Sequence, residues 1–213
     1  MAKENKKEQR YHNSIPIDSD EEYFMLLWLE ELMDAGFIDK IERAETFVLS
    51  ERFVNEYEEV KELKTKSKTI QKEQILLEKH VYTPEFKITL SPMGVKLLSW
   101  RKFTRNDGSY YPINSKFTKL FVEHYGGLEH EVYLEIKPEW DQNNMERLFK
   151  INRAWVYQKY GVFINLIKPL QLFEKTFTPK AYMTTTTGKK RVIHFETRTL
   201  DQYILENGNT ERS

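Results

Sequence analysis

Glu135 and Lys137 lie two residues apart in the stretch Glu131–Pro138 and could act together on one chemical group. The positions between and before them are apolar: Val132, Leu134 and Ile136. This alternation is typical of a short β-strand, in which residues two apart point to the same face. A carboxylate can hold a hard cation, and a neighbouring amine can orient a water and offset phosphate charge. The spacing therefore predicts a metal-assisted hydrolytic site on this strand.

A second strand-like stretch, Tyr82-Thr83-Pro84-Glu85-Phe86, places a carboxylate directly after a proline. The Glu-x-Lys spacing is frequent in this chain, and it also occurs at 4–6, 59–61, 62–64 and 85–87. Three of those copies lie in highly charged stretches, where a solvated surface is the better interpretation. Glu135-Ile136-Lys137 alone combines an apolar strand pattern with a following proline, which can end the strand.

With a Pro-acid strand followed by a Glu-x-Lys strand, the chain resembles the PD-(D/E)XK nuclease superfamily. Within it, the chain is similar to small phage-encoded endonucleases and Holliday junction resolvases, whose first core helix carries a glutamate in a Ser-x-x-Glu arrangement. Here Ser19-Asp20-Glu21-Glu22 matches. The resemblance implies a catalytic set and a metal site: Glu22, Glu85, Glu135 and Lys137, with Mg²⁺ or Mn²⁺ held by Glu85, Glu135 and the backbone carbonyl of Ile136.

The implied activity is a metal-dependent endonuclease that hydrolyses DNA phosphodiester bonds in phage or mobile-element recombination. Glu85 departs from the family pattern, which has aspartate there, and one extra methylene matters to metal geometry. A degenerate member that binds nucleic acid or serves as a structural phage protein is therefore the alternative. A third possibility is an unrelated α/β interaction protein, which a large separation of Glu85 from Lys137 would favour.

The fold class expected is α/β (α+β), with the superfamily's αβββαβ core: a mixed central sheet flanked by helices. Ser19 is a good N-cap, Glu22 completes a capping box and Gly36 ends the helix, which predicts a helix over 19–35. The capping role is an alternative explanation of Glu22. Strands are expected at 46–50, through 53–60, and at 75–90 with a break near Thr83, while 61–72 suits a loop or hairpin tip.

A second helix is predicted over 146–160, ending at Gly161, followed by a strand over 162–167. Its apolar face is expected to contain Leu148, Ile151, Trp155 and Val156. Nucleic-acid contacts are expected from this helix and from a basic loop near the C-terminus, although each of these side chains could simply be solvated: Lys150, Arg153, Gln158, Lys159, Lys189, Lys190 and Arg191.

The chain is expected to divide into a mobile polar leader (1–13), a nuclease-like core (14–173) and a basic C-terminal extension (174–213). About forty residues (91–130) form a long insertion between the two motif strands, with aromatic residues interleaved with Lys and Arg. That pattern suits stacking on unpaired bases, and it equally suits an ordinary half-buried hairpin.

Composition narrows the class of protein. Aromatic residues make up 14% of the 213 residues, which is ample for a packed core, and no cysteine is present for a disulfide, a thiolate zinc site or a nucleophile. No apolar run is long enough to span a membrane, so we expect a cytoplasmic protein, in the host cytoplasm if phage-encoded.

The 33 basic and 33 acidic residues balance, so any attraction for DNA must be local. DNA is the expected partner, and the resemblance allows a homodimer.

Overall fold

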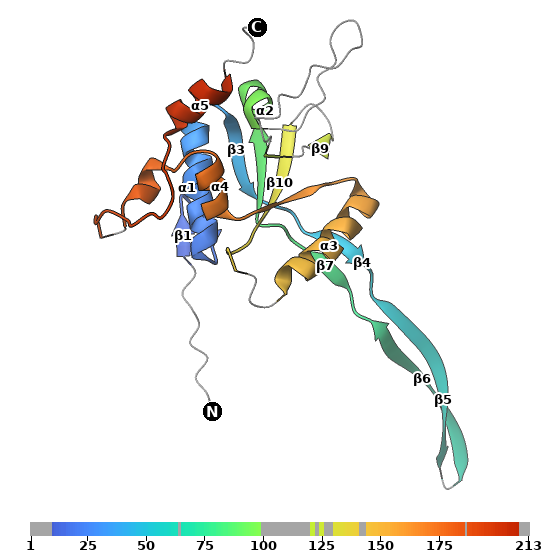
Figure 1. Cartoon of the computed structure of the whole chain (residues 1–213). Coiled ribbons are helices and arrows are strands. Elements are labelled where there is room, and N and C mark those ends of the chain that lie inside the picture. Colours follow the sequence, from blue (N-terminus) through green and yellow to red (C-terminus); the bar gives the residue numbers. More distant parts are fainter. Residues whose placement is uncertain are drawn as a thin grey trace, which may run out of the picture.

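The structure is a computed structural model, and it describes residues 10–63, 65–98, 120–121, 124–125, 130–140, 144–185 and 187–208. It is a mixed α+β arrangement of helices and several sheets, in agreement with the expected fold class (Figure 1). The helices are α1 (Asp20–Asp34), α2 (Pro92–Leu98), α3 (Met145–Tyr160), α4 (Pro169–Lys175), the short 3-10 helix η1 (Lys180–Met183) and α5 (Leu200–Gly208). The strands are β1 (Arg10–His12), β2 (Ile15–Ile17), β3 (Ile38–Arg43), β4 (Phe47–Ser50), β5 (Phe53–Leu63), β6 (Lys66–Leu77), β7 (His80–Tyr82), β8 (Phe86–Leu90), β9 (His124–Tyr125), β10 (His130–Ile136) and β11 (Ile164–Ile167). None of the helices in these ranges is long and apolar enough to cross a membrane.

The central sheet has the strand order β11-β10-β8-β3, and the short β9 also pairs with β10. β10 and β11 run parallel and are connected through α3, whereas β8 is antiparallel to both β10 and β3. A parallel pair needs such a crossover, which here is a helix. The elements that build and connect this sheet therefore follow the order α1, β3, β8, β10, α3, β11.

The two faces of β10 pack against different helices. Val132 and Leu134 belong to the larger hydrophobic cluster with α1, while Tyr133 packs with Phe149 of α3 in a second cluster. Alternation along the strand thus assigns one face to each helix. Glu135 and Lys137 follow the parity of Tyr133 and lie on the α3 face of the sheet.

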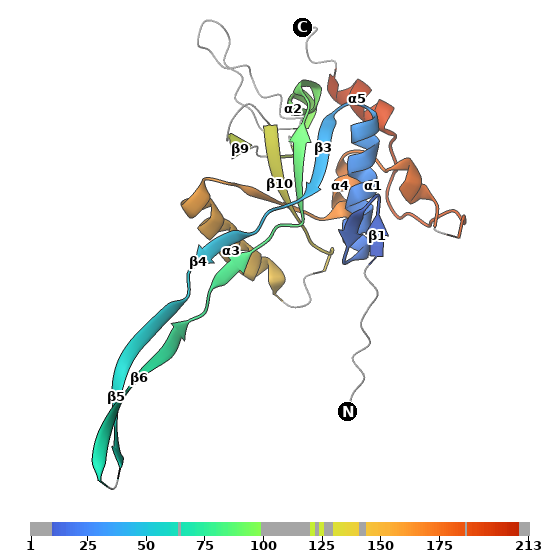
Figure 2. The same ribbon diagram turned by 180° about the vertical axis from the view of Figure 1, so that it is seen from behind.

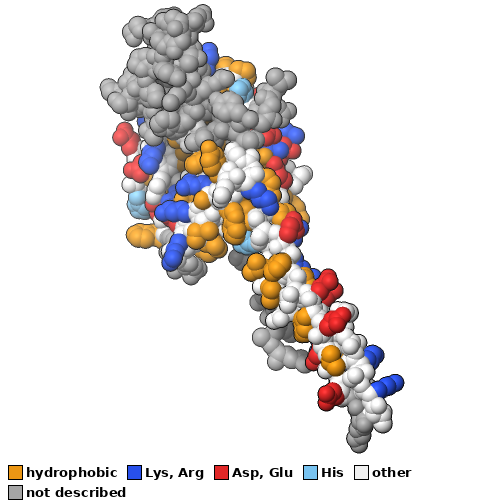
Figure 3. Space-filling view, turned by 90° about the vertical axis from the view of Figure 1, so that its right-hand side faces the viewer, with side chains coloured by type: hydrophobic (Ala, Val, Ile, Leu, Met, Phe, Trp, Pro, Cys, Tyr) orange, Lys and Arg blue, Asp and Glu red, His pale blue; other side chains and the backbone are white. Residues whose placement is uncertain are grey.

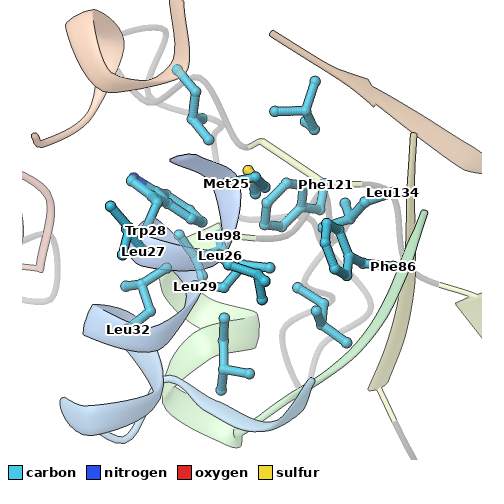
Figure 4. Packing of buried hydrophobic residues seen from close by; sticks show 14 of the residues in the cluster. Met25, Leu26, Leu27, Trp28, Leu29, Leu32, Phe86, Leu98, Phe121 and Leu134 are labelled. Carbon is cyan, nitrogen blue, oxygen red and sulfur yellow. The ribbon is translucent and has the colours of Figure 1, made fainter. Parts of the chain in front are cut away.

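Helix α1 is buried because it is apolar almost all round. Met25, Trp28, Leu29 and Leu32 are fully buried, and Figure 4 shows side chains of this helix directed toward Phe86, Phe121 and Leu134. The predicted boundaries are confirmed: Ser19 is the N-cap and Ala35 the C-cap, and Gly36 follows with φ +77°. A glycine suits that position, since side chains disfavour a left-handed backbone.

The C-terminal segment packs into the core. Phe177, Tyr182, Leu200 and Tyr203 belong to the same cluster as α1, and the Trp28 indole stacks on Phe177 at 5.2 Å. The indole nitrogen also donates to Thr176 Oγ1 at 3.1 Å. The described residues of the expected C-terminal extension, 174–208, therefore pack against the same core as α1.

At the other end, part of the expected leader over 1–13 forms a strand. Arg10–His12 forms β1 with β2, and Arg10 pairs with Asp20 at 2.8 Å. Residues 1–9 of the expected leader lie outside the described residues.

A two-stranded ribbon, β5–β6, extends from the body of the molecule (Figures 1 and 2). It continues the shorter pair β4–β7, and the register pairs Phe53 with Leu77 at its base and Leu63 with Lys66 near its tip. Of the two alternatives for 61–72, the hairpin tip agrees with the structure, because the turn between β5 and β6 lies within this segment and the two strands include most of the rest of it.

Helix α3 matches the predicted span but buries a different face. Phe149, Asn152 and Val156 are buried, whereas Leu148 and Ile151 are about half exposed. Of the four residues expected on the buried face, only Val156 is buried.

The insertion between β8 and β10 is described only in part. Ser91 Oγ accepts from the amide of Gly94 and begins α2, and Phe121 is fully buried in the main core. The basic aromatic segment 99–119 lies outside the described residues.

Candidate active site

The register of the central sheet brings the two motif carboxylates together. Leu134 of β10 pairs with Phe86 of β8 in an antiparallel ladder. Glu135 comes one residue after Leu134 and Glu85 one residue before Phe86, so the two glutamates lie opposite each other. The Glu85 amide donates to the carbonyl of Leu134 at 3.0 Å, which fixes this pairing.

Each oxygen of the Glu135 carboxylate has its own partner, Lys137 for one and Tyr82 for the other. Lys137 Nζ lies 2.6 Å from Oε1, and the Tyr82 hydroxyl donates to Oε2 at 2.7 Å. Glu135 is buried, with only 5% of its side chain exposed. Burial and the neighbouring Glu135 charge raise the pKa of Tyr82, which keeps its hydroxyl protonated and able to donate.

Glu22 joins the site from the first turn of α1 through Arg43. The Arg43 guanidinium contacts Glu22 Oε2 at 2.6 Å and Glu85 Oε2 at 3.0 Å. Glu22 also performs its capping role, because its amide donates to Ser19 Oγ and its carboxylate accepts from the Asp18 amide. Glu22 therefore caps the helix and is also joined to Glu85 through Arg43.

Glu85 is the carboxylate with the most perturbed ionisation. Its pKa rises to about 7, first because of burial and then because of the charges of Glu22 and Glu135. Arg43 and Lys137 act in the opposite direction on the same group. Glu85 and Lys137 thus lie close enough to interact electrostatically. A large separation between them would have favoured an unrelated interaction protein, and the structure does not have it.

The charges of this cluster do not balance. Three glutamates face two cationic side chains, so full ionisation leaves one excess negative charge in a largely buried place. The negative charges of Glu22 and Glu135 add to burial in raising the pKa of Glu85, and protonation of Glu85 relieves the excess. A divalent cation could relieve it instead, and the available donors are hard oxygens of the kind that Mg²⁺ prefers.

The arrangement is nevertheless not a preformed metal cage. Among the described residues, no three His, Cys, Asp or Glu side chains are grouped so that they could hold a metal ion. The Arg43 guanidinium bridges Glu22 and Glu85. The carboxylate oxygens of Glu85 and Glu135 are donors of the kind that a divalent cation prefers, whereas Glu22 is already engaged by Arg43.

The predicted nucleic-acid residues of α3 separate into two pairs. Lys150 and Gln158 line an open hollow of about 800 Å³ on the outer side of α3, together with Arg147, Ile151 and Trp155. None of the four predicted catalytic side chains lines this hollow.

The other pair on α3 is held by contacts within the protein. Arg153 lies over the rings of Phe149 and Phe163 at 5.1 and 5.0 Å, and its charge acts on Tyr82. Lys159 donates to the carbonyl of Val48 at 2.8 Å. Arg153 therefore lies within electrostatic reach of Tyr82, the residue that donates to Glu135.

The basic loop near the C-terminus lies apart from these groups. Figure 1 shows the loop after η1 and helix α3 on opposite sides of α1. Lys189 and Lys190 are exposed, but Arg191 donates to the Tyr182 carbonyl and lies 4.4 Å from that ring. Arg191 therefore stabilises the C-terminal segment, and the loop is not brought to the site.

Two residues of the site were missed by reasoning from the sequence: Arg43 and Tyr82. Tyr82 lies in the motif stretch itself and could have been found from its position three residues before Glu85. Arg43 carries no such signal, since its role depends on the pairing of β3 with β8, in which Arg43 lies opposite Phe86.

Comparison with known proteins gives no further information about the site: no family model, no curated protein and no solved structure matches the chain.

Proposed function

We propose that the protein is a metal-dependent DNA endonuclease of the PD-(D/E)XK type. The observation that supports this most is the convergence of Glu85, Glu135 and Lys137 at the ends of paired strands, with one negative charge in excess. Carboxylate oxygens that can hold a divalent cation, beside an amine, suit metal-assisted phosphodiester hydrolysis.

The element order supports the same proposal. The series α1, β3, β8, β10, α3, β11 is similar to the αβββαβ core of the superfamily, with the Pro-acid motif before β8 and the Glu-x-Lys motif at the end of β10. In this comparison the ribbon β5–β6 and the segment between β8 and β10 are additions to the core.

Each side chain has a role that follows from its contacts. A bound Mg²⁺ would supply an activated water and would stabilise charge on the phosphate. Glu135, fixed by Tyr82, and Glu85 would hold the cation together with the Ile136 carbonyl. Lys137 lies where its amine can orient the attacking water and offset the phosphate charge. Arg43 holds Glu22 and Glu85 in place.

A second candidate is a member of the same fold that binds DNA without cutting it, for example in phage recombination or as a structural phage protein. Two observations favour it: Arg43 already neutralises part of the cluster, and Glu85 replaces the usual aspartate. The two candidates share a fold, so only an assay of cleavage separates them.

The test is incubation of the protein with a panel of labelled DNAs: duplex, single strand, flap and four-way junction. Each is assayed with Mg²⁺, with Mn²⁺ and with chelator, for the wild type and for Glu135→Ala and Lys137→Ala. Glu131→Ala is the matched control, because Glu131 lies on the same strand and pairs with Lys87 away from the cluster.

Metal-dependent cutting that both site variants lose and the control keeps would support the nuclease and identify the preferred DNA. Binding of DNA without any cutting would favour the second candidate. Cutting that survives Glu135→Ala would overturn the assignment of the site.

A further inference from the structure

The ribbon β5–β6 has two faces of opposite charge. The register pairs Glu56 with Glu73 and Glu58 with Gln71, and Glu62 lies on this same face by alternation. The described side chains of this face carry no lysine or arginine. The opposite face contains the pair Tyr57 and Lys72, the pair Lys61 and Lys68, the residue Glu59 and, near the tip, Lys66.

Two contacts confirm which residues share a face. Gln71 donates to Glu58 at 2.5 Å on the acidic face, and Lys72 pairs with Glu59 on the basic face. Glu59 is the one acidic residue on the basic face, so that face keeps a net positive charge. Lys61, Lys66 and Lys68 are exposed and make no ion pair with any other residue in the described part of the chain.

This charge arrangement is unfavourable to the ribbon alone. Lys61 lies directly opposite Lys68, and Glu56 lies directly opposite Glu73. Like charges in directly opposed positions destabilise a strand pair, and an isolated two-stranded ribbon is only marginally stable in water. Distributing the same residues in alternating signs would have avoided this cost. A negatively charged partner would offset the repulsion between the lysines on the basic face.

The size of the ribbon matches duplex DNA. β6 has twelve residues, which extend about 40 Å, close to one helical turn of about 35 Å. Lys66 and Lys68 are two residues apart, so their Cα atoms are separated by about 7 Å along the strand. A two-stranded ribbon also fits the width of the major groove.

The ribbon is joined directly to the candidate active site. It continues through β4 and β7, and β7 ends at Tyr82, which donates to Glu135. Figure 3 shows charged side chains along the length of the ribbon as it leaves the body. DNA bound along the ribbon would therefore approach the strand that leads into the Pro-acid motif.

We propose that the basic face of the ribbon, formed by Lys61, Lys66, Lys68 and Lys72, binds the phosphate backbone of duplex DNA and carries much of the affinity of this protein for it. The acidic face points away from the DNA and prevents the ribbon from binding through its other side. This inference rests on the proposed function and extends it by naming the surface that receives the substrate.

The test is equilibrium binding of a fluorescein-labelled DNA duplex of about three helical turns, measured by anisotropy in chelator at several salt concentrations. The test variant carries Lys61→Gln, Lys66→Gln, Lys68→Gln and Lys72→Gln. The matched control removes the same number of charges from the other face: Glu56→Gln, Glu58→Gln, Glu62→Gln and Glu73→Gln. All these side chains are exposed, and circular dichroism melting of each variant verifies that folding is unchanged.

We expect the lysine variant to bind about 10- to 100-fold more weakly at low salt. The slope of log K against log salt should become less negative by up to about 3.6, since each of the four lysines that neutralises a phosphate contributes about 0.9. The control should bind as tightly as the wild type or more tightly. Equal loss in both variants, unchanged affinity in the lysine variant, or no duplex binding by the wild type would overturn the inference. Preferential competition by duplex RNA through the same lysines would also overturn it.

Chelator separates this inference from the proposed hydrolysis. Loss of binding in the lysine variant of a protein that never cuts DNA would leave the ribbon as the DNA-binding surface and remove the nuclease. Cutting by the wild type together with unaltered binding by the lysine variant would support the nuclease and overturn the ribbon as the DNA-binding surface.

Discussion

At the scale of single residues, the ionisation of Glu85 controls the charge of the cluster. Burial and the charges of Glu22 and Glu135 raise its pKa from the ordinary value of 4.5 to about 7. Near neutral pH the site therefore exchanges between a protonated form with balanced charge and an ionised form with one negative charge in excess. A divalent cation should bind the ionised form, so its affinity should increase as the pH rises through 7.

The substitution Glu85→Gln should stabilise the protein in alkaline solution. Between pH 4.5 and 7 the folded protein retains a proton that the unfolded chain has released, so the free energy of unfolding decreases as pH rises. Glutamine removes this penalty. In chelator at about pH 8, the free energy of unfolding should increase by about 1–3 kcal/mol, and at about pH 4.5 the effect should vanish. Thermal melting at both pH values measures this, and a variant less stable at the higher pH would contradict the assignment.

The substitution Arg43→Gln should destabilise the metal-free protein. It leaves Glu22 and Glu85 without their shared cation in a buried place, and breaking such pairs costs about 3 kcal/mol or more. Mg²⁺ should then raise the melting temperature of the variant more than that of the wild type, because the cation replaces part of the lost charge. Arg52→Gln is the control, since Arg52 is exposed and lies 3.9 Å from Glu78. Equal melting temperatures of the Arg43 variant and the wild type would show that Arg43 does not stabilise the protein by compensating the charges of Glu22 and Glu85.

At the scale of elements, helix α3 illustrates why burial is hard to predict from periodicity. Its sequence offers two apolar faces one residue apart, since Leu148 and Ile151 compete with Phe149 and Val156. The structure selects the second because Phe149 and Val156 fit against Tyr133 and Ile164 of the sheet. Local pattern establishes that a helix forms, and the shape of its partner decides which face is buried.

A pair of neighbouring substitutions tests this orientation. Phe149→Ala should lower the free energy of unfolding by about 3–5 kcal/mol, because Phe149 is only 2% exposed. Leu148→Ala should change it by no more than about 0.5 kcal/mol, since that side chain is 48% exposed. Chemical denaturation gives both values, and similar losses in the two variants would mean that the helix is rotated.

At the scale of the whole molecule, local signals in the sequence are sufficient to predict α1, α3, the strands near the two motifs and the convergence of Glu85, Glu135 and Lys137. The capping box at Ser19, the glycine at 161 and the alternation before Lys137 each lie within a few residues of the feature they predict. The contacts of Arg43 could not be predicted, because they join residues from three separate elements. The packing of Trp28 in α1 on Phe177 after α4 likewise joins segments far apart in the sequence. Neither segment alone indicates that the other is its partner.

The ribbon β5–β6 should be dispensable for folding. Ser50 pairs with His80 at the end of the β4–β7 ladder, so a two-residue Asn-Gly turn can replace residues 51–79. None of the described side chains of β5 or β6 belongs to either hydrophobic cluster, so the melting temperature should change by only a few degrees. The affinity for duplex DNA should decrease as it does in the lysine variant. A deletion variant that cannot fold would show that the ribbon supports the core.

The measurement that tests the central claim most directly is the rate at which supercoiled circular DNA is nicked as Mg²⁺ is increased, in the wild type and in Glu135→Gln. The glutamine keeps the size of Glu135 and can still accept from Tyr82, so the substitution removes charge with little change of shape. We predict nicking that saturates with Mg²⁺ in the wild type and decreases by about 10²–10⁴-fold in the variant, the range typical when one essential catalytic group is lost. Equal nicking by both proteins, or none by the wild type at any Mg²⁺ concentration, would contradict the account.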